Sequence, residues 1–338
     1  MCKIHKEKKL KKIAKYWEQN ENQLVTCNLC FHHCKIKPGQ RGLCNVRGNE
    51  QGKLYNMEFG ETISISVDPI EKKPLFHFFP DSVITSIGPN GCNLDCPFCQ
   101  NSEISQQKSP TYFLSPEQAG ELSAQNNSIG LAYTYTEPLI WFEYLLEAGE
   151  KVRERGGYNV LVSNGTINPE PLKELLPVID AANIDLKSFS SKTYKEILKG
   201  DLDSVLNTIT TLVENNIHVE ITTLIVTGLN DSESEIEDII NFLAELNPEI
   251  PYHLSRYFPH YKYQQRPTDT NLILSYYELA KQKLPHTFIG NFFHSDKENS
   301  YCPDCKHLWI KRSGFHSEVV GIENGLCLKC KREVGFPI

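Results

Sequence analysis

Between Ser86 and Asn101 the chain reads SIGPNGCNLDCPFCQN. The stretch begins inside an apolar run, Val83–Ile87, whose composition is typical of a buried strand. Three cysteines follow at C-x3-C-x2-C spacing, Cys92, Cys96 and Cys99, and no fourth cysteine lies near them. A closed structural metal site needs four ligands. An incomplete set therefore indicates a site that takes an external ligand, as when three thiolates hold a four-iron cluster and leave one iron open. A zinc loop that shares a distant fourth ligand is the alternative.

From about residue 82 to 290, strand-like apolar runs alternate with helical patterns. We expect strands at Val83–Ile87, Leu131–Tyr135, Asn159–Val162, Ala182–Leu186, His218–Val226, Tyr252–Ser255 and His286–Ile289. We expect helices from Ser115-Pro116 onward and near 138–154, 169–177, 203–215, 233–246 and 271–283. Such alternation predicts an α/β fold with parallel strands and right-handed crossovers. A complete or partial β/α barrel fits it, an open doubly wound sheet is the alternative, and no G-x-G-x-x-G or P-loop follows a strand.

Cysteine usage is the most informative part of the composition. The chain has 338 residues, 12 cysteines and a net charge of −7, and no apolar stretch is long enough to span a membrane. The N-terminus has no apolar region of the kind a secretory signal needs, so we expect a cytoplasmic protein with reduced thiols that act as metal ligands. The negative charge argues against nucleic acid as a partner.

Two further cysteine groups flank the central region. Cys302, Cys305, Cys327 and Cys330 form two C-x2-C pairs 21 residues apart, which predicts a zinc ribbon. Cys27, Cys30, Cys34 and Cys44 form a C-x2-C-x3-C-x9-C group, for which zinc is favoured and an auxiliary iron–sulfur cluster is the alternative. Cys2 is left over. We expect four segments: a basic amphipathic helix at 1–22, a Cys-rich module at 23–81, the barrel at 82–298 and the ribbon at 299–338.

The helix at 1–22 is predicted from spacing. Leu10, Ile13, Ala14 and Trp17 recur at i, i+3, i+4 and i+7, and seven lysines accompany them in residues 1–18. Such a helix would dock on the body with a solvated lysine face, and contact with an acidic partner is the alternative.

The C-x3-C-x2-C loop, with Phe98 before the last cysteine, resembles the radical S-adenosylmethionine (SAM) superfamily. This resemblance implies a partial (β/α)6-type barrel and a 4Fe-4S cluster on Cys92, Cys96 and Cys99 whose open iron chelates SAM. One electron, from a donor such as flavodoxin or ferredoxin, would then yield a 5′-deoxyadenosyl radical that abstracts hydrogen from substrate. Phe98 and Asn101 would lie beside the cofactor.

Other residues acquire roles from their places at the ends of the predicted strands. Glu137 is placed to bind the cofactor's ammonium, although the glycines common there in the superfamily are absent, and its alternative is to begin a helix before Pro138. Ser163 and Asn164 contact the cofactor or form an ordinary Asn-Gly turn. Asp185 and Lys187 face the same side of their strand, as functional charges or as a simple ion pair. His253 or Arg256 would pack on the adenine or ribose, or contact substrate.

A narrower resemblance covers nearly the whole chain. The segments 68–77, 99–105, 132–135, 183–188, 253–257 and 290–291 and the terminal ribbon resemble AmmeMemoRadiSam-type radical enzymes, relatives of pyruvate formate-lyase activating enzymes. Thr227, where a proline is usual, and the ending Gly335-Phe336-Pro337-Ile338, where a tryptophan is usual, depart from that pattern.

Three functions remain in view. The first is an activase-like enzyme that makes a radical on a protein. The second is a radical SAM enzyme that modifies a peptide, RNA or small molecule. The third is a non-catalytic, zinc-organised binding module.

Overall fold

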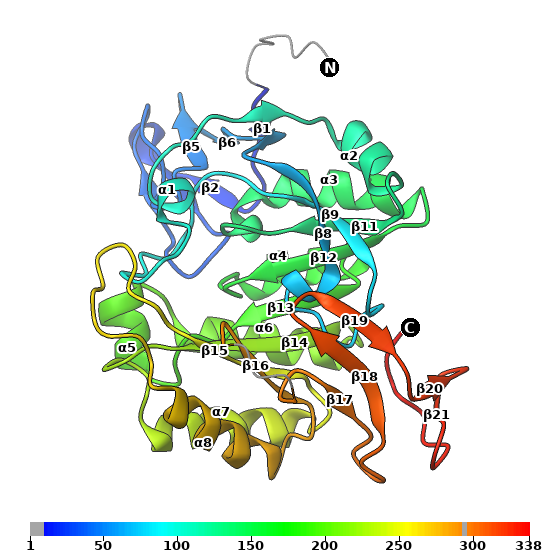
Figure 1. Cartoon of the computed structure of the whole chain (residues 1–338). Helices are drawn as coiled ribbons and strands as arrows, with labels where there is room; N and C mark the ends of the chain where they lie inside the picture. Colours follow the sequence, from blue (N-terminus) through cyan, green and yellow to red (C-terminus); the bar gives the residue numbers. More distant parts are fainter. Residues whose placement is uncertain (1–9, 293–295) are drawn as a thin grey trace.

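The central feature of the computed structural model, which describes residues 10–292 and 296–338, is one eight-stranded sheet (Figure 1). Its order is β16-β15-β14-β13-β12-β11-β9-β8. The strands are β8 (Ile65–Pro69), β9 (Val83–Ile87), β11 (Ser128–Tyr133), β12 (Tyr158–Ser163), β13 (Ala181–Asp185), β14 (His218–Ile225), β15 (Tyr252–Arg256) and β16 (Thr287–Gly290).

The strand order decides between the two predicted architectures. From β9 to β16 every neighbouring pair is parallel, and the spatial order follows the chain order. A doubly wound sheet would reverse its order at a switch point, and this sheet does not. Only β8, at one edge, is antiparallel to its neighbour. Because β8 and β16 are not paired with each other, the barrel is partial, as the sequence predicted.

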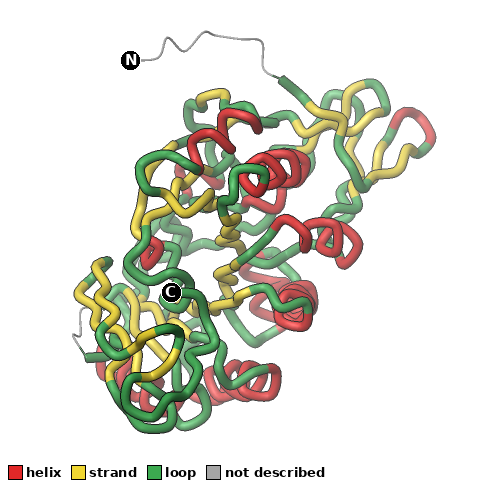
Figure 2. Tube along the Cα trace, turned by 90° about the vertical axis from the view of Figure 1, so that its right-hand side faces the viewer, coloured by secondary structure: helices red, strands yellow, loops and turns green. Residues whose placement is uncertain are grey.

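Helices connect the parallel strands and lie along one side of them, to the right of the column of strands in Figure 2. They are α2 (Pro116–Ser123), η3 (Pro138–Trp141), α3 (Phe142–Arg153), α4 (Pro169–Leu175), η4 (Leu176–Val178), α6 (Leu202–Glu214), α7 (Glu233–Leu246) and α8 (Thr270–Lys281). The helix expected from Ser115-Pro116 onward begins with a capping box: the Ser115 hydroxyl accepts from Gln118 N, and Gln118 Oε1 accepts from Ser115 N. Sequence reasoning missed the short turns α1 (Ser102–Ser105), α5 (Ser191–Thr193) and η5 (Tyr194–Leu198).

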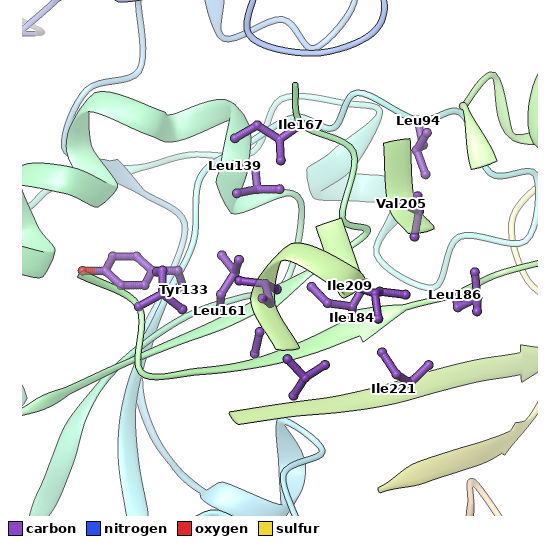
Figure 3. Packing of buried hydrophobic residues seen from close by; sticks show 14 of the residues in the cluster. Leu94, Tyr133, Leu139, Leu161, Ile167, Ile184, Leu186, Val205, Ile209 and Ile221 are labelled. Carbon is purple, nitrogen blue, oxygen red and sulfur yellow. The ribbon is translucent and has the colours of Figure 1, made fainter. Parts of the chain in front are cut away.

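The core lies between the sheet and these helices (Figure 3). Leu161, Ile184 and Ile221 come from three successive strands and are at most 1% exposed. They pack in one cluster with Val205 and Ile209 of α6. Burial of these aliphatic faces fixes the strand order and so places the carboxyl ends of the strands side by side.

The N-terminal module consists of two small antiparallel sheets, drawn in blue at the top of Figure 1. They are formed by β1 (Lys12–Ile13), β2 (Trp17–Gln19), β3 (Val25–Cys27), β4 (Lys35–Ile36), β5 (Arg47–Glu50) and β6 (Lys53–Asn56), with the 3-10 turn η1 (Glu21–Gln23) after β2. Two further short strands, β7 (Glu61–Thr62) and β10 (Tyr112–Phe113), pair with each other, and the turn η2 (Ile70–Lys72) follows β8.

The predicted helix at 1–22 is wrong for the part that the structure describes, and residues 1–9 lie outside the described residues. Residues 12–13 and 17–19 are strands, and Tyr16 has φ 55°, which no right-handed helix contains. Leu10 and Ile13 are exposed while Ala14 is buried, so the four apolar residues do not share one face. Pairing of the backbone with β6 outweighed a helical period carried by only four residues.

The C-terminal segment forms the strands β17 (Ser300–Tyr301), β18 (Leu308–Ser313), β19 (His316–Val319), β20 (Ile322–Glu323) and β21 (Leu326–Cys327). It lies at the opposite end of the molecule from the N-terminal module (Figure 1). Arg312 of β18 donates to the carbonyl of Phe76 at 2.6 Å, and Phe79 N donates to the carbonyl of Pro337 at 3.0 Å. The segment therefore docks on the residues that lead into β9.

Candidate active site

Cys92, Cys96 and Cys99 line one cavity at the carboxyl end of the sheet, on the loop after β9. The cavity has a volume of about 220 Å³. Its other lining residues come from β14, from the ends of β11, β12, β13, β15 and β16 and from the loop itself: Leu94, Phe98, Gln100, Asn101, Ser105, Tyr135, Thr136, Glu137, Asn164, Asp185, Lys187, Thr222, Leu224, Ser255 and Asn291. The loops that follow parallel strands thus form the candidate site, as expected for a β/α barrel.

The surroundings of the cysteine sulfurs fit an iron–sulfur cluster. Leu94 N donates to Cys92 Sγ at 3.3 Å, the amide of Asn164 lies 3.6 Å from the same sulfur, and Ser105 Oγ lies 3.2 Å from Cys99 Sγ. Hydrogen bonds of this kind set the reduction potential of iron–sulfur clusters. The three sulfurs are not gathered within 4.8 Å of one another, as a single metal ion would require.

Gly91 precedes Cys92 and has φ 97°. A Cβ at this position would lie 2.3 Å from the carbonyl oxygen of Cys44 in the N-terminal module. In the structure, the group that approaches Gly91 is the neighbouring module.

Glu137 is fully buried at the end of β11 and lines the cavity. Its Oε1 accepts from Leu139 N at 2.9 Å and from Ser163 Oγ at 2.7 Å, and its Oε2 accepts from Asn164 N at 2.8 Å. Burial raises the pKa of Glu137 to about 7, because the three hydrogen bonds only partly offset the loss of water. Glu137 caps η3, which agrees with the alternative that it begins a helix before Pro138. It also lines the cavity.

Asn164 connects the loop after β12 to the cysteine loop. Its Nδ2 donates to Asn93 Oδ1 at 2.9 Å, and its Oδ1 accepts from Thr166 N at 2.9 Å. Ser163, whose hydroxyl bonds Glu137, is not part of the cavity wall. The predicted turn at Asn164-Gly165 is therefore present, and Asn164 also lines the cavity at the cysteines.

Asp185 and Lys187 both line the cavity and form an ion pair at 2.8 Å. Burial by itself lowers the pKa of Lys187, but the Asp185 carboxylate and the nearby Cys96 sulfur raise it further than burial lowers it. Lys187 is therefore a permanent cation beside the cysteine loop. The predicted ion pair is present, and a functional role for the two charges stays a prediction.

Phe98 and Asn101 lie on the same wall. Phe98 is 4% exposed, and its ring contacts Tyr263 edge to face. Asn101 Nδ2 donates to the carbonyl of Tyr135 at 2.6 Å. The cysteine loop is thereby tied to the end of β11.

The structure does not bring Arg256 or His253 into the wall of this cavity. Side chains alternate along β15, so Ser255 reaches the cavity while the guanidinium of Arg256 points elsewhere, over Phe258 and onto the carbonyl of Thr268. His253 shares the face of Ser255 but lies nearer the start of the strand, where it bonds Glu220 at 2.6 Å.

A second, inner cavity of about 750 Å³ adjoins the first. Asn101, Tyr135, Asp185 and Ser255 line both. The remaining wall includes buried and partly buried groups from the sheet and from the segment before β9: Glu71, Lys73, Pro74, Phe76, His253 and Ile289. Exposed residues at its rim are Lys72 and, from the β18–β19 hairpin, Gly314 and Phe315. The cavity at the cysteines therefore opens into the interior of the barrel.

Sequence reasoning missed several of these residues. Tyr135 has φ 74°, a conformation that glycine adopts most easily, at the position where glycines were expected and absent. Its hydroxyl donates to Asp68 Oδ2 at 3.0 Å, and Lys73 Nζ donates to the same oxygen at 2.7 Å. Asp68 and Lys73 belong to the segment 68–77 that carried the narrower resemblance, which was the available signal. Asn291 belongs to the segment 290–291 of the same resemblance, whereas Thr136 had no such signal.

The C-terminal cysteines form a compact set. The sulfurs of Cys302, Cys305, Cys327 and Cys330 all lie within 4.8 Å of one another, with 3.5 Å between Cys302 and Cys330 and 3.7 Å between Cys305 and Cys327. Four thiolates at this spacing fit one tetrahedral metal ion. The N-terminal set, Cys27, Cys30, Cys34 and Cys44, lines one small cavity. Asn93, from the loop that carries Cys92, also lines it.

Comparison with known proteins assigns the family. The profile described as the Radical SAM superfamily matches residues 86–243, which includes all three cysteines of the loop and Glu137. The chain belongs to the radical SAM superfamily. An uncharacterized protein of Methanocaldococcus jannaschii, MJ0808, is 38% identical over 329 residues, 95% of this chain and 98% of that protein. Superfamily membership implies an enzyme that uses a four-iron cluster and SAM.

Further similarities bear on the branch of the radical SAM superfamily and on the fold. A putative glycyl-radical enzyme activating enzyme of M. jannaschii, MJ1227, is 28% identical over 175 residues, 48% of this chain and 68% of that protein. This supports the predicted relationship to activating enzymes. The crystal structure of Streptococcus suis SuiB bound to S-adenosylmethionine aligns with 66% of this chain and 53% of its own at a TM-score of 0.52 and 15% identity, which shows the radical SAM fold. The likeness to AmmeMemoRadiSam-type enzymes stays a prediction.

Among residues 10–292 and 296–338, no helix has both the length and the apolar character to cross a membrane.

Proposed function

We propose that this radical SAM enzyme forms a 5′-deoxyadenosyl radical in the cavity at Cys92, Cys96 and Cys99 and abstracts hydrogen from a polypeptide that reaches the inner cavity. The observation that carries this is the continuity of the two cavities through Asn101, Tyr135, Asp185 and Ser255. A radical that forms beside the cysteines would face the inner cavity directly, because these shared residues line both spaces.

The chain's own residues suit the binding of SAM. When bound, the cluster supplies the electron that cleaves the sulfonium and the open iron that chelates the amino and carboxylate groups. Glu137 is a buried carboxylate that accepts three hydrogen bonds, and the amino group of the positively charged cofactor would donate a further one to it, which stabilises its charged form. Lys187 places a positive charge in the same cavity, which favours the cofactor's carboxylate.

A polypeptide substrate is supported by the similarity to a putative glycyl-radical enzyme activating enzyme. An enzyme of this kind must admit a loop of a partner protein. The inner cavity, at about 750 Å³, has room for a short extended segment. We also propose that a low-potential donor such as flavodoxin or ferredoxin supplies the electron that reduces the cluster. For the C-terminal thiolates we propose zinc as the metal.

A small molecule is the second candidate substrate. Pockets for such ligands have volumes of about 300–1,000 Å³, a range that includes the inner cavity. Lys73 and His253 would supply polar contacts there, and Phe76 an apolar one. The net charge of −7 disfavours RNA.

The test is anaerobic reconstitution with iron and sulfide, followed by dithionite and SAM. We expect 5′-deoxyadenosine from the natural chain and none from Cys96→Ala. Absence of 5′-deoxyadenosine from the fully reconstituted natural chain would refute the proposal. Candidate polypeptides with deuterated glycine then distinguish the substrates: deuterium in the 5′-deoxyadenosine identifies a polypeptide, and transfer only from small molecules identifies the second candidate.

A further inference from the structure

We propose that Cys27, Cys30, Cys34 and Cys44 hold a second four-iron cluster rather than zinc, and that this cluster passes electrons to the cluster at Cys92. The assignment of the cluster stands on geometry alone. The electron transfer rests in addition on the proposed function.

The separation of the sulfurs argues against zinc. Four thiolates around one tetrahedral zinc lie about 3.8 Å apart, given Zn–S bonds of about 2.3 Å. The C-terminal cysteines meet this condition, with all ligand atoms within 4.8 Å. In residues 10–292 and 296–338, no other set of three or more cysteine, histidine or acidic ligand atoms gathers as closely. The sulfurs of the N-terminal cysteines are therefore spaced more widely than the ligands of one zinc ion, as are the sulfurs of Cys92, Cys96 and Cys99.

The four N-terminal cysteines nevertheless surround one common space. All four line a single small cavity, together with Ile36, Ile140 and other buried groups. A cubane holds its thiolates farther apart than one ion does, because irons and sulfides lie between them. Four thiolates that face one enclosed space at wide spacing therefore fit a cubane.

Arg47 supplies an independent observation. It lines the same cavity, and its side chain is 2% exposed. Nη2 forms an ion pair with Glu143 Oε1 at 2.9 Å, but Nε is buried and has no hydrogen-bond partner among the described residues. A buried N–H without a partner is costly, and the sulfides of a cluster are acceptors that would satisfy it.

The N-terminal site adjoins the loop that carries Cys92, Cys96 and Cys99. The carbonyl of Cys44 packs against Gly91, one residue before Cys92. Asn93 lines the N-terminal cavity, its carbonyl bonds His32 Nε2 at 2.7 Å, and its side chain bonds Asn164, which also contacts Cys92 Sγ. One layer of backbone and side chains thus separates the two sites.

The transfer itself is a single-electron step. A low-potential one-electron donor reduces the N-terminal cluster, which is reoxidised when it reduces the cluster at Cys92. No bond forms or breaks, and the two clusters together end one electron richer than before.

The first test removes the radical cluster and leaves the N-terminal site untouched. In the full chain with Cys92→Ala, Cys96→Ala and Cys99→Ala, reconstitution with iron and sulfide should leave about four irons and four sulfides per chain, with one zinc. Reduction by dithionite should give an electron paramagnetic resonance signal. Further replacement of Cys30 and Cys34 by alanine should remove the iron and retain the zinc. Two zinc ions and no iron in the triple variant would overturn the assignment.

Two spectroscopic tests address the role of Arg47 and the transfer. Arg47→Lys keeps a cation for Glu143 but removes Nε, so the signal of the triple variant should shift if Arg47 bonds the cluster, and an unchanged spectrum would overturn that contact. In the reduced natural chain, two adjacent clusters should broaden each other's signals. A spectrum equal to the sum of the two single-site variants would overturn the electron transfer while leaving the proposed function intact.

Discussion

Glu137 Oε1 lies 2.7 Å from Ser163 Oγ, so the ends of β11 and β12 are joined inside the candidate site by a fully buried carboxylate. A buried carboxyl in this position resists ionisation until a cation arrives. Two measurable consequences follow, one for stability and one for SAM binding.

Without SAM, Glu137 should make stability depend on pH. Its folded-state pKa is raised from 4.5 to about 7, so the protonated carboxyl favours the fold at low pH, and this contribution is lost as pH rises through 7. Glu137→Gln cannot ionise. Between pH 5 and pH 8 the natural chain should lose about 3 kcal/mol relative to the variant. Thermal unfolding of both proteins at the two pH values measures this.

The same variant should bind SAM weakly. A neutral amide is a weaker acceptor than a carboxylate for the amino group of the positively charged cofactor, so we expect a loss of about 2 kcal/mol or more in binding. Parallel stability profiles of the two proteins, together with unchanged SAM affinity, would contradict both the burial argument and the assigned role.

Gly91→Ala should prevent correct assembly of the cysteine loop. The new Cβ would lie 2.3 Å from the Cys44 carbonyl oxygen, and main chain cannot move aside. Gly156→Ala is the matched control, because Gly156 also has a positive φ, 73°, but nothing within 4 Å of its Cβ position. The control should cost about 1 kcal/mol of stability, whereas Gly91→Ala should also lower iron content. Equal iron content in the two variants would show that the contact is unimportant.

Glu220→Gln should destabilise the fold strongly. Glu220 is fully buried, and its carboxylate accepts from Phe76 N, His77 N and His253 at 2.6 to 2.9 Å. Although burial raises the pKa of Glu220, His218 and His253 hold it well below its usual range, so its stabilisation is present at neutral pH and lost on acidification.

We expect a cost of about 3 kcal/mol for Glu220→Gln, because an amide would turn donors toward two backbone N–H groups. Glu154→Gln, at an exposed ion pair with Lys151, should cost less than about 0.5 kcal/mol. Denaturant unfolding at pH 7 compares them, and similar midpoints would refute the importance of the buried network.

Cys305→Ala should release the C-terminal metal and lower the melting temperature while the iron at Cys92 remains. The ribbon has only a small apolar cluster around Trp309 and Ile310, so the metal supplies much of its stability. Metal analysis and thermal unfolding check this. Loss of iron in step with zinc would show that the two sites are not independent.

Much of the fold could be predicted because its signals are local. The strands β9 and β12 to β16 begin and end within one or two residues of the predicted ranges, since each is a compact apolar run followed by a turn. Consecutive parallel order follows from strand–helix alternation, but the choice of barrel over doubly wound sheet needed the pairing itself.

The parts that failed depend on contacts distant in sequence. Residues 12–13 and 17–19 form strands because β6 is available to pair with β1 and β3 to pair with β2. Arg256 leaves the site because strand alternation gives that face to Ser255. Tyr135 holds a glycine-like φ because Asp68, 67 residues earlier, anchors its hydroxyl. No pattern within a short window of the chain contains that information.

The hairpin between β18 and β19 places Gly314 and Phe315 on the wall of the inner cavity, while its strands belong to the metal-organised ribbon. None of the four ribbon cysteines lines either cavity, so the ribbon meets the inner cavity through this hairpin and not through its metal-binding residues. Under the proposed assignments of zinc to the ribbon and of the substrate to the inner cavity, a cell short of zinc would keep an enzyme able to cleave its cofactor but with an altered chamber for the substrate. Trace-metal supply would then govern which molecules this enzyme consumes, rather than how fast it makes radicals.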